Sequence, residues 1–383
     1  MKAHVFASCI LMLPALAVGQ GDPKEVKIDG KRHLDALKSG NGQAALELVK
    51  AREKAVPGLI EILENDSPFA QGHAARALGS IGPRAKAAVP ALCKALAQTD
   101  FVAAEASLAL GRIGPAAAAG LIASLKDDNE NVRSLAASAI KEIRPLPKEA
   151  VPPLIEALKK SKESTPGRAL IIDAIGAAGP AAKEAVPTLL KSLTGKVPPG
   201  PEDVHIVVAL GKIGKGAGQA VPVLSEILKK KEGAWIALRF HAIDALGGMG
   251  PAAKEAVPGM FALLKDLSGP ARLKVLQALT NIGAADKDAV EALNEGMRDR
   301  DPVVRVHAAR MLGKIDPNHL AVVSVLIESL REKDARVRIL AAETIAEVRP
   351  RDTAVVEALT QASRDDDPLV RKAMEGALKK LKK

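Results

Sequence analysis

The chain has 383 residues, a formal net charge of +10, and 48% hydrophobic but only 2% aromatic residues. The charge is spread evenly along the sequence, whereas nucleic-acid-binding proteins usually concentrate it, so we expect no nucleic-acid partner. One tryptophan, five phenylalanines and no tyrosine are too few for a platform on which bases or sugars could stack.

The first 19 residues have the features of a secretory signal peptide. Lys2 precedes an apolar run over residues 5–18, and Ala17-Val18-Gly19 has the small-x-small form of a cleavage site. An apolar run of this length is too short to cross a membrane comfortably. We therefore expect cleavage after Gly19, no membrane span in the remaining chain, and delivery to the bacterial periplasm or the cell exterior.

A recurring phrase organises the rest of the chain. Residues 20–53 are predicted to form an N-terminal segment with a capping helix, and residues 54–383 one elongated repeat domain. The phrase Ala-Val-Pro occurs at residues 55–57, 88–90, 150–152, 185–187, 220–222 and 256–258. With the degenerate copies included, neighbouring copies lie 30–36 residues apart. A period in this range indicates stacked supersecondary units.

Each unit is predicted to contain two amphipathic helices. The first begins at the proline, whose missing N–H costs nothing in the first turn of a helix. A polar turn such as Asp301-Pro302 starts the second helix, with Asp as its N-cap. The second helix is rich in alanine and ends at Gly-Pro, where we expect glycine as a left-handed cap. No stretch alternates with a period of two, so the fold class is all-α.

The combined pattern resembles HEAT repeats of the phycobilisome-lyase type. It is carried by phrases such as Asp301-Pro302-Val303-Val304-Arg305 followed by Leu312-Gly313-Lys314-Ile315. The resemblance covers residue 54 to the C-terminus and implies a right-handed α-solenoid of about ten HEAT-like helix pairs. It says little about function, because one fold hosts many functions.

An arginine recurs seven residues before a repeated leucine or isoleucine of the second helix. Its copies are Arg133, Arg168, Arg239, Arg272, Arg305, Arg338 and Arg371. The resemblance implies a structural ladder, in which each arginine bonds an aspartate in the turn of its own or the next repeat. Asp301, Asp334 and Asp367 are suitably placed for this role.

A polar stripe is the best candidate for a binding surface. His205, His241, Lys274 and His307 occupy one position in successive repeats, five residues before the same leucine, as does His73 earlier in the chain. Residues three and seven positions later share that helix face. The predicted stripe is His205, Lys212, His241, Asp244, Lys274, Gln277, His307, Arg310 and Lys314. The resemblance implies that second helices line the concave side, so the stripe would face the groove; the alternative is ordinary half-buried helix residues.

Metal and catalytic sites are not expected. Adjacent repeats would hold the histidines about 10 Å apart, too far to share one ion. HEAT-type deoxyhypusine hydroxylase holds its irons with His-Glu dipeptides, and no histidine here is followed by glutamate. Without its signal peptide the chain keeps only Cys93, which cannot form an internal disulfide or a thiolate metal cage.

The sequence thus favours a secreted, non-catalytic solenoid, without cofactor, that binds a protein or peptide along its concave face. One alternative is a lyase-like or other enzyme accessory that uses the stripe from His205 to His307. A weaker alternative is a binder of an anionic polymer.

Overall fold

The computed structural model describes residues 30–39, 41, 43–193, 199–231, 233, 235–267, 269–283, 290–350 and 352–381. The predicted signal peptide lies outside the described residues. The segment predicted to hold one capping helix contains two, α1 (Gly30–Lys38) and α2 (Gln43–Lys50).

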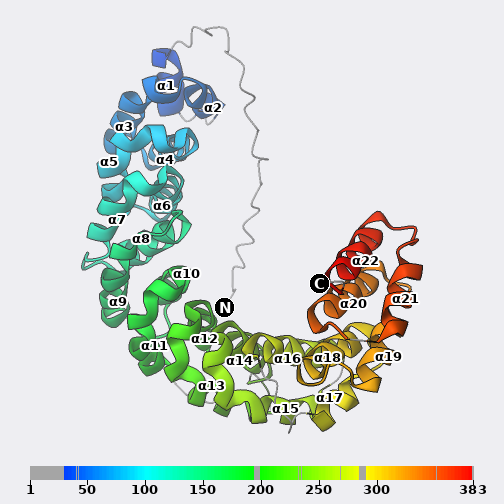
Figure 1. The fold of residues 1–383 in the computed structure, drawn as a ribbon. Coiled ribbons are helices and arrows are strands. Elements are labelled where there is room, and N and C mark those ends of the chain that lie inside the picture. The colour runs from blue at the N-terminus through cyan, green and yellow to red at the C-terminus, as the bar shows by residue number, and fades with distance from the viewer. Residues whose placement is uncertain are drawn as a thin grey trace.

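The described chain is an open arc of paired helices with no strand in the ranges given above (Figure 1). The first helices of the pairs form its outer, convex layer and the second helices its inner, concave layer, as the repeats predict. The outer helices are α3 (Val56–Asn65), α5 (Val89–Ala95), α7 (Ala118–Ser124), α9 (Val151–Lys160), α11 (Val186–Ser192), α13 (Val221–Leu228), α15 (Val257–Asp266), α17 (Val290–Gly296), α19 (Leu320–Ser329) and α21 (Thr353–Ala362). The inner helices are α4 (Pro68–Ile81), α6 (Asp100–Ile113), α8 (Glu130–Glu142), α10 (Pro166–Ala177), α12 (Pro201–Ile213), α14 (Trp235–Met249), α16 (Gly269–Ile282), α18 (Pro302–Ile315), α20 (Ala335–Val348) and α22 (Pro368–Leu381).

The prediction of an all-α solenoid is therefore confirmed. Each inner helix packs against its own outer helix and against the inner helices of the neighbouring repeats. The core is correspondingly one continuous apolar layer between the two helix layers, with side chains such as Leu59, Leu78, Leu110 and Leu210 fully buried. Because each repeat buries its apolar side chains only against its neighbours, the chain can be long without a single large core. The right-handed sense of the superhelix stays a prediction.

Helix starts follow the sequence signals closely. Proline lies in the first turn of all six outer helices that begin at Ala-Val-Pro. Asp301 caps α18 by accepting from the N–H of Val303, and Asp334 caps α20 in the same way. These side chains satisfy N–H groups that have no partner inside the helix.

The glycine of the Gly-Pro phrase, at which the inner helix ends, does not have the predicted left-handed helical conformation. Gly82 has φ +69° and ψ −140°, and Gly114 has φ +79° and ψ −138°. This is not the left-handed helical region but the neighbouring one that almost only glycine adopts. The chain then continues as a short 3₁₀ helix that leads into the next outer helix: η2 (Gly82–Ala88), η3 (Gly114–Ala117), η5 (Gly179–Ala185), η6 (Gly214–Ala220) and η7 (Gly250–Ala256). Glycine thus redirects the chain towards the next outer helix. Two further short 3₁₀ helices are η1 (Arg52–Ala55) and η4 (Lys148–Ala150).

The Leu-Gly dipeptide of the second helix marks the closest contact between repeats. A Cβ added at Gly211 would lie 2.8 Å from Cα of Ala245 in the next inner helix, and one at Gly79 would lie 2.7 Å from Cα of Ala109. Glycine on one helix and alanine on the next therefore let the backbones approach. The alanine-rich second helix follows from the same need for small side chains at this contact.

We expect Gly211→Ala to lower the free energy of unfolding by about 2 kcal/mol, because the added methyl group overpacks the α12–α14 contact. Urea denaturation followed by circular dichroism measures the effect. Gly376→Ala in α22 is the matched control, since no atom lies within 4 Å of its added Cβ and alanine is the better helix former. Equal stability of the two variants would contradict the close packing.

One described stretch, Asp100–Ser124, is long and apolar enough to cross a membrane by composition alone. Half of it is buried in the fold, and it bends at Gly114, which has φ +79°. It consists of α6, the inner helix of one repeat, the connection η3, and α7, the outer helix of the next repeat. These are the properties of core helices in a solenoid.

Candidate binding surface

The exposed side of the inner helices forms the concave surface. A repeated leucine or isoleucine of each inner helix packs into the core, fully buried in every repeat but the last, where Leu378 is partly buried. We call it the reference residue. The reference residues are Leu78, Leu110, Ile140, Ile175, Leu210, Leu246, Leu279, Leu312, Ile345 and Leu378, with Leu48 in α2. Side chains five and two positions before it are exposed or half-buried in nearly all repeats. Because the other sides of each inner helix pack on its neighbours, these positions face the hollow of the arc (Figure 1).

The predicted stripe lies on this surface, but most of its charges are paired. Lys274 Nζ bonds both carboxylate oxygens of Asp244 at 2.7 Å. Arg310 and Lys314 share Glu347 of the next repeat, with 2.9 Å between Lys314 Nζ and Glu347 Oε1. The structure therefore brings some predicted residues together as ion pairs between repeats. It does not present them as a row of free cations.

The remaining members of the stripe differ in exposure. His205 is half-buried and its Nδ1 lies 2.8 Å from Asp173 Oδ1 of the preceding repeat. His241 is half-buried, whereas Lys212 and Gln277 are exposed. The three histidines belong to separate repeats and do not converge on one point. In the described part of the chain, no group of three or more His, Cys, Asp or Glu side chains could hold a metal ion.

His307 corrects the prediction. Only 8% of the residue is exposed, and its buried Nδ1 has no hydrogen-bond partner within the described chain. Helix α18 packs against α16, α17, α19 and α20. His307 is therefore buried, whereas the equivalent His205 in α12 is half-buried. Burial, with the nearby Arg310 adding to it, lowers the pKa of His307 to about 4. The imidazole is neutral at pH 7 and offers little surface to a ligand.

Four charged residues of this surface were missed by the sequence reasoning: Arg76, Glu105, Asp173 and Glu347. Arg76 in α4 donates two hydrogen bonds to Glu105 in α6, one of them at 3.1 Å. The pairs Arg76–Glu105, Asp173–His205 and Asp244–Lys274 share a rule: a residue two before the reference residue meets one five before it in the next repeat. Aligning the repeats and comparing charges across neighbours could have revealed three of the four residues.

The repeated arginines bond the turn between the outer and the inner helix of their own repeats. Arg305 Nη1 donates to the carbonyl oxygens of Asp299 and Arg300 at 3.0 and 3.2 Å. Arg338 and Arg371 bond the equivalent carbonyls. Backbone carbonyls in a turn have no partner in a helix, so a guanidinium with several fixed donors suits them.

The same arginines also bond acids of the following repeat. Arg272 Nη1 meets Asp299 at 2.9 Å, Arg305 Nη2 meets Glu332 at 2.5 Å, and Arg338 Nη2 meets Asp365 at 2.8 Å. The predicted partners Asp301, Asp334 and Asp367 instead accept from N–H groups of their own inner helices. The N-cap carboxylate points at its own helix, so the acid two residues earlier is the one that meets the arginine.

Arg168 has the most buried ion pair of this set. Its Nη1 donates to the carbonyls of Leu158 and Ser161 at 2.6 and 2.9 Å, and Nη2 donates to Ser192 Oγ at 2.7 Å. Its Nε lies 2.7 Å from Glu202, and the two side chains are 7% and 6% exposed. Arg133 and Arg239 are buried as well. These side chains stabilise the stack and are not available to a ligand.

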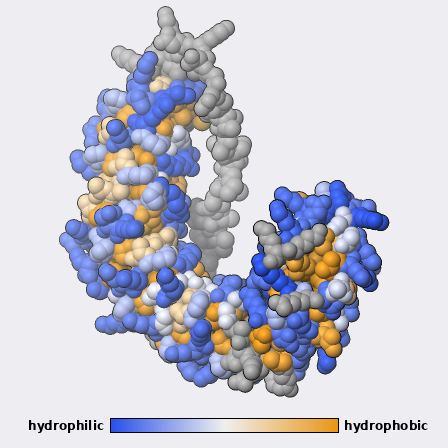
Figure 2. Space-filling model, viewed as in Figure 1, coloured by the Kyte–Doolittle hydropathy of each residue, from blue (hydrophilic) through white to orange (hydrophobic). Residues whose placement is uncertain are grey.

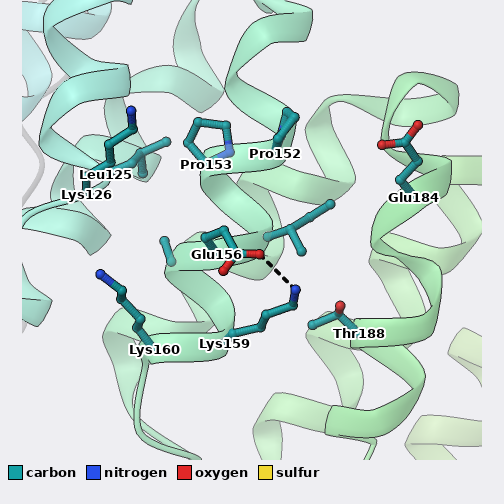
Figure 3. Close-up of a pocket in the computed structure, with 11 residues that line it drawn as sticks. Leu125, Lys126, Pro152, Pro153, Glu156, Lys159, Lys160, Glu184 and Thr188 are labelled. Carbon is teal, nitrogen blue, oxygen red and sulfur yellow. Dashed lines mark hydrogen bonds and ion pairs between the residues drawn. The ribbon is translucent and has the colours of Figure 1, made fainter.

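A groove of about 680 Å³ lies on the convex side, between α7, α9 and α11 (Figure 3). Pro152, Pro153 and Ile155 contribute apolar surface. Glu156 and Lys159 at its edge form an ion pair of 2.8 Å within α9. The groove holds no histidine or cysteine and none of the predicted stripe. It does not have the arrangement of nucleophile, base and oxyanion donors that a catalytic site needs.

Comparisons with known proteins agree with this architecture. A family model described as HEAT repeats matches residues 38–111, 118–199, 221–313 and 257–335, together more than half of the chain. The match does not distinguish the phycobilisome-lyase type of repeat. No curated protein matches the sequence.

Solved structures with a similar fold include several karyopherins. A crystal structure of importin beta has a TM-score of 0.63 at 15% identity and covers 92% of this chain and 57% of that one. The Kap95:Nup1 complex has a TM-score of 0.61 at 12% identity, with 94% and 58% covered. Yeast importin-beta (Kap95p) has 0.55 at 11% identity, with 92% and 57% covered. The chain spans about half the length of the solved structures it matches. At these identities the likeness shows the fold alone.

Proposed function

Because the chain belongs to the HEAT-repeat family, we propose that it is a secreted or periplasmic scaffold that binds a protein or peptide along its concave surface, without catalysis. The observation that carries the proposal is the concave surface itself. The inner helices α4 to α22 place their exposed faces along one side of the arc (Figure 1). Extended concave surfaces of this kind suit binding of another chain over several repeats.

Two further observations support a protein partner. The similar structure of Kap95 is a complex with Nup1, and that of Kap121p is bound to the extreme C-terminus of the phosphatase Cdc14p. The concave surface carries charges of both signs, several of which pair between repeats. A surface with both signs of charge suits a protein partner better than a uniformly anionic polymer. The proposed export rests on the signal-peptide features of residues 1–19.

The alternative of an enzyme accessory that uses the His205–His307 stripe has less support. His307 is buried and His205 is held by Asp173. The side chains of the stripe therefore do not converge on a reacting group as general acid–base catalysis requires.

Photo-crosslinking tests the proposed function. We expect a photoreactive amino acid at Gln277, exposed on the concave surface, to crosslink a protein from a secreted or periplasmic fraction. The same group at Val223, 39% exposed on the outer helix α13, is the control and should give no such product. Crosslinks from the convex position only, or from neither position, would contradict concave binding.

A further inference from the structure

The N-terminal part of the concave surface carries an apolar patch. Leu46, Phe69, Phe101 and Leu108 are 48%, 51%, 40% and 52% exposed. They lie on three consecutive inner helices, α2, α4 and α6. Leu46 and Leu108 stand two residues before their reference residues, which is a concave position, and Phe69 and Phe101 stand nine before theirs. Arg76 holds the position of α4 that corresponds to Leu46 and Leu108. We call the four apolar side chains the apolar patch.

The two phenylalanines of the patch are joined through His73. The ring of His73 lies 4.5 Å from that of Phe69 and 6.1 Å from that of Phe101, between centroids. Phe101 lies against Gly72, where an added Cβ would come within 2.1 Å of its ring. Burial, with Arg76 adding to it, lowers the pKa of His73, so the imidazole is neutral at pH 7. The rings of two repeats therefore form one continuous surface.

Elsewhere in the described chain, no three consecutive inner helices each carry an exposed large apolar side chain. The other large exposed apolar residues are Val223, Ile236, Leu320, Val356 and Leu369. They belong to five different helices, only two of which, α14 and α22, are inner helices. Figure 2 shows apolar surface among hydrophilic side chains on the N-terminal arm and also on the C-terminal arm. Exposed aromatic and aliphatic side chains that gather on a binding surface are typical anchors of an interface.

The charges around the patch favour an acidic ligand. Lys50 is 63% exposed and its partner Glu47 only 32%, and Arg76 is 49% exposed and its partner Glu105 only 13%. Arg112, two residues after the reference residue of α6, is also exposed. Asp100, directly before Phe101, is an exposed acid. Beside Leu46 and Leu108, in the C-terminal halves of α2, α4 and α6, the most exposed charged groups are the cations Lys50, Arg76 and Arg112.

We propose that the apolar patch is the anchor point for the partner, and that it takes an amphipathic helical segment with acidic residues beside its apolar face. This inference rests on the proposed function and names the partner class for that surface. The patch spans three repeats, roughly 20 Å at about 10 Å per repeat. An α-helix rises 1.5 Å per residue, so about 14 residues cover that length. Binding of an amphipathic helix through its apolar face is a common mode of peptide recognition.

Labelled synthetic peptides of about 18 residues test the proposal by fluorescence anisotropy with the full chain. One peptide places leucines at helical spacing with flanking glutamates; a second has the same composition in scrambled order; a third has lysines in place of the glutamates. We expect the first to bind and the other two to bind at least about tenfold more weakly. No binding of the first peptide, or equal binding of either control peptide, would overturn the proposal. Equal binding of the scrambled acidic peptide would indicate an anion binder.

Substitutions locate the site. Phe69→Gln with Leu108→Gln should weaken binding of the acidic amphipathic peptide about tenfold or more, since truncation of an anchor is the costly change in an interface. Leu369→Gln, at the equivalent position to Phe69 but in α22 and 64% exposed, is the matched control and should bind within twofold of wild type. Arg112→Gln, which alters an exposed side chain and leaves the core intact, should weaken the acidic peptide and not one with glutamines in place of glutamates. Unchanged binding in the patch variant overturns the proposal.

The proposed function and this inference can fail separately. If Gln277 still crosslinks the natural partner equally well in the Phe69→Gln/Leu108→Gln variant, concave binding holds and the patch is not its anchor. If no concave position crosslinks a protein and the peptides do not bind, both proposals fail.

Discussion

Replacement of Arg168 by methionine is expected to lower the free energy of unfolding by about 3–5 kcal/mol, the usual effect of removing one partner from a buried ion pair. The guanidinium neutralises Glu202, which also accepts from the N–H of Ser164 at 2.6 Å. Without Arg168, the carboxylate of Glu202 stays buried and the carbonyls of Leu158 and Ser161 lose their donor. Urea denaturation at pH 7, with hydrogen exchange of the amides in α9 and α10, measures the loss.

Two further variants define the cause. Arg336→Met is the control. The Arg336 side chain is 90% exposed and bonds Asp334, so its removal is expected to change the free energy of unfolding little. Arg168→Met combined with Glu202→Leu should be more stable than Arg168→Met alone, because no unpaired charge remains. Hydrogen exchange is included because repeat proteins can unfold in parts. A stable Arg168→Met single variant would show that the ion pair does not hold these repeats together.

Acidification is expected to destabilise the fold through His307, by about 3 kcal/mol between pH 7 and pH 4. The folded chain keeps this imidazole neutral, with a pKa of about 4, whereas in the unfolded chain its pKa is about 6.5. Below pH 6.5 the unfolded state therefore binds a proton that the folded state does not, and stability falls as the pH falls. The effect is complete once the pH passes the folded pKa. Urea midpoints at pH 7, 6, 5 and 4 measure it.

His307→Leu is the control for this effect, since leucine occupies the equivalent position at Leu135, Leu170 and Leu340. The variant should lose less stability than wild type between pH 6.5 and pH 4, while the two should share the remaining pH dependence of their carboxylates. Parallel curves of stability against pH for the two proteins would contradict this prediction, because they would mean that His307 binds a proton as readily in the folded state as in the unfolded state.

Local signals in the sequence were sufficient for the helices. The prolines of Ala-Val-Pro start outer helices, and Asp301 and Asp334 cap inner ones as predicted. These features depend on which backbone groups a single residue can satisfy or block, so they can be recognised one repeat at a time. The connections between repeats were harder to predict from the sequence. The unusual ψ of Gly82 and the 3₁₀ helix from Gly82 to Ala88 depend on how the next repeat is placed.

The candidate site was only partly predictable. The position of the stripe on the inner helices followed from the period, and Figure 1 shows those helices on the concave side. The period did not show which stripe residues are held in ion pairs. Lys274 pairs with Asp244 of the preceding repeat, and Arg310 with Glu347 of the next. The apolar patch was missed because Phe69 and Phe101 belong to different repeats, and only packing brings them to the same histidine.

By itself the sequence determined the all-α class, the helix pairs, their starts and the repeat length, because these depend on interactions within about one repeat. The tertiary structure decided which charges neutralise each other, that His307 is buried, and where apolar side chains gather on the concave surface. Those properties depend on the register between inner helices of neighbouring repeats, about 30 residues apart in the chain. A shift of that register would keep every helix and change every pair on the surface.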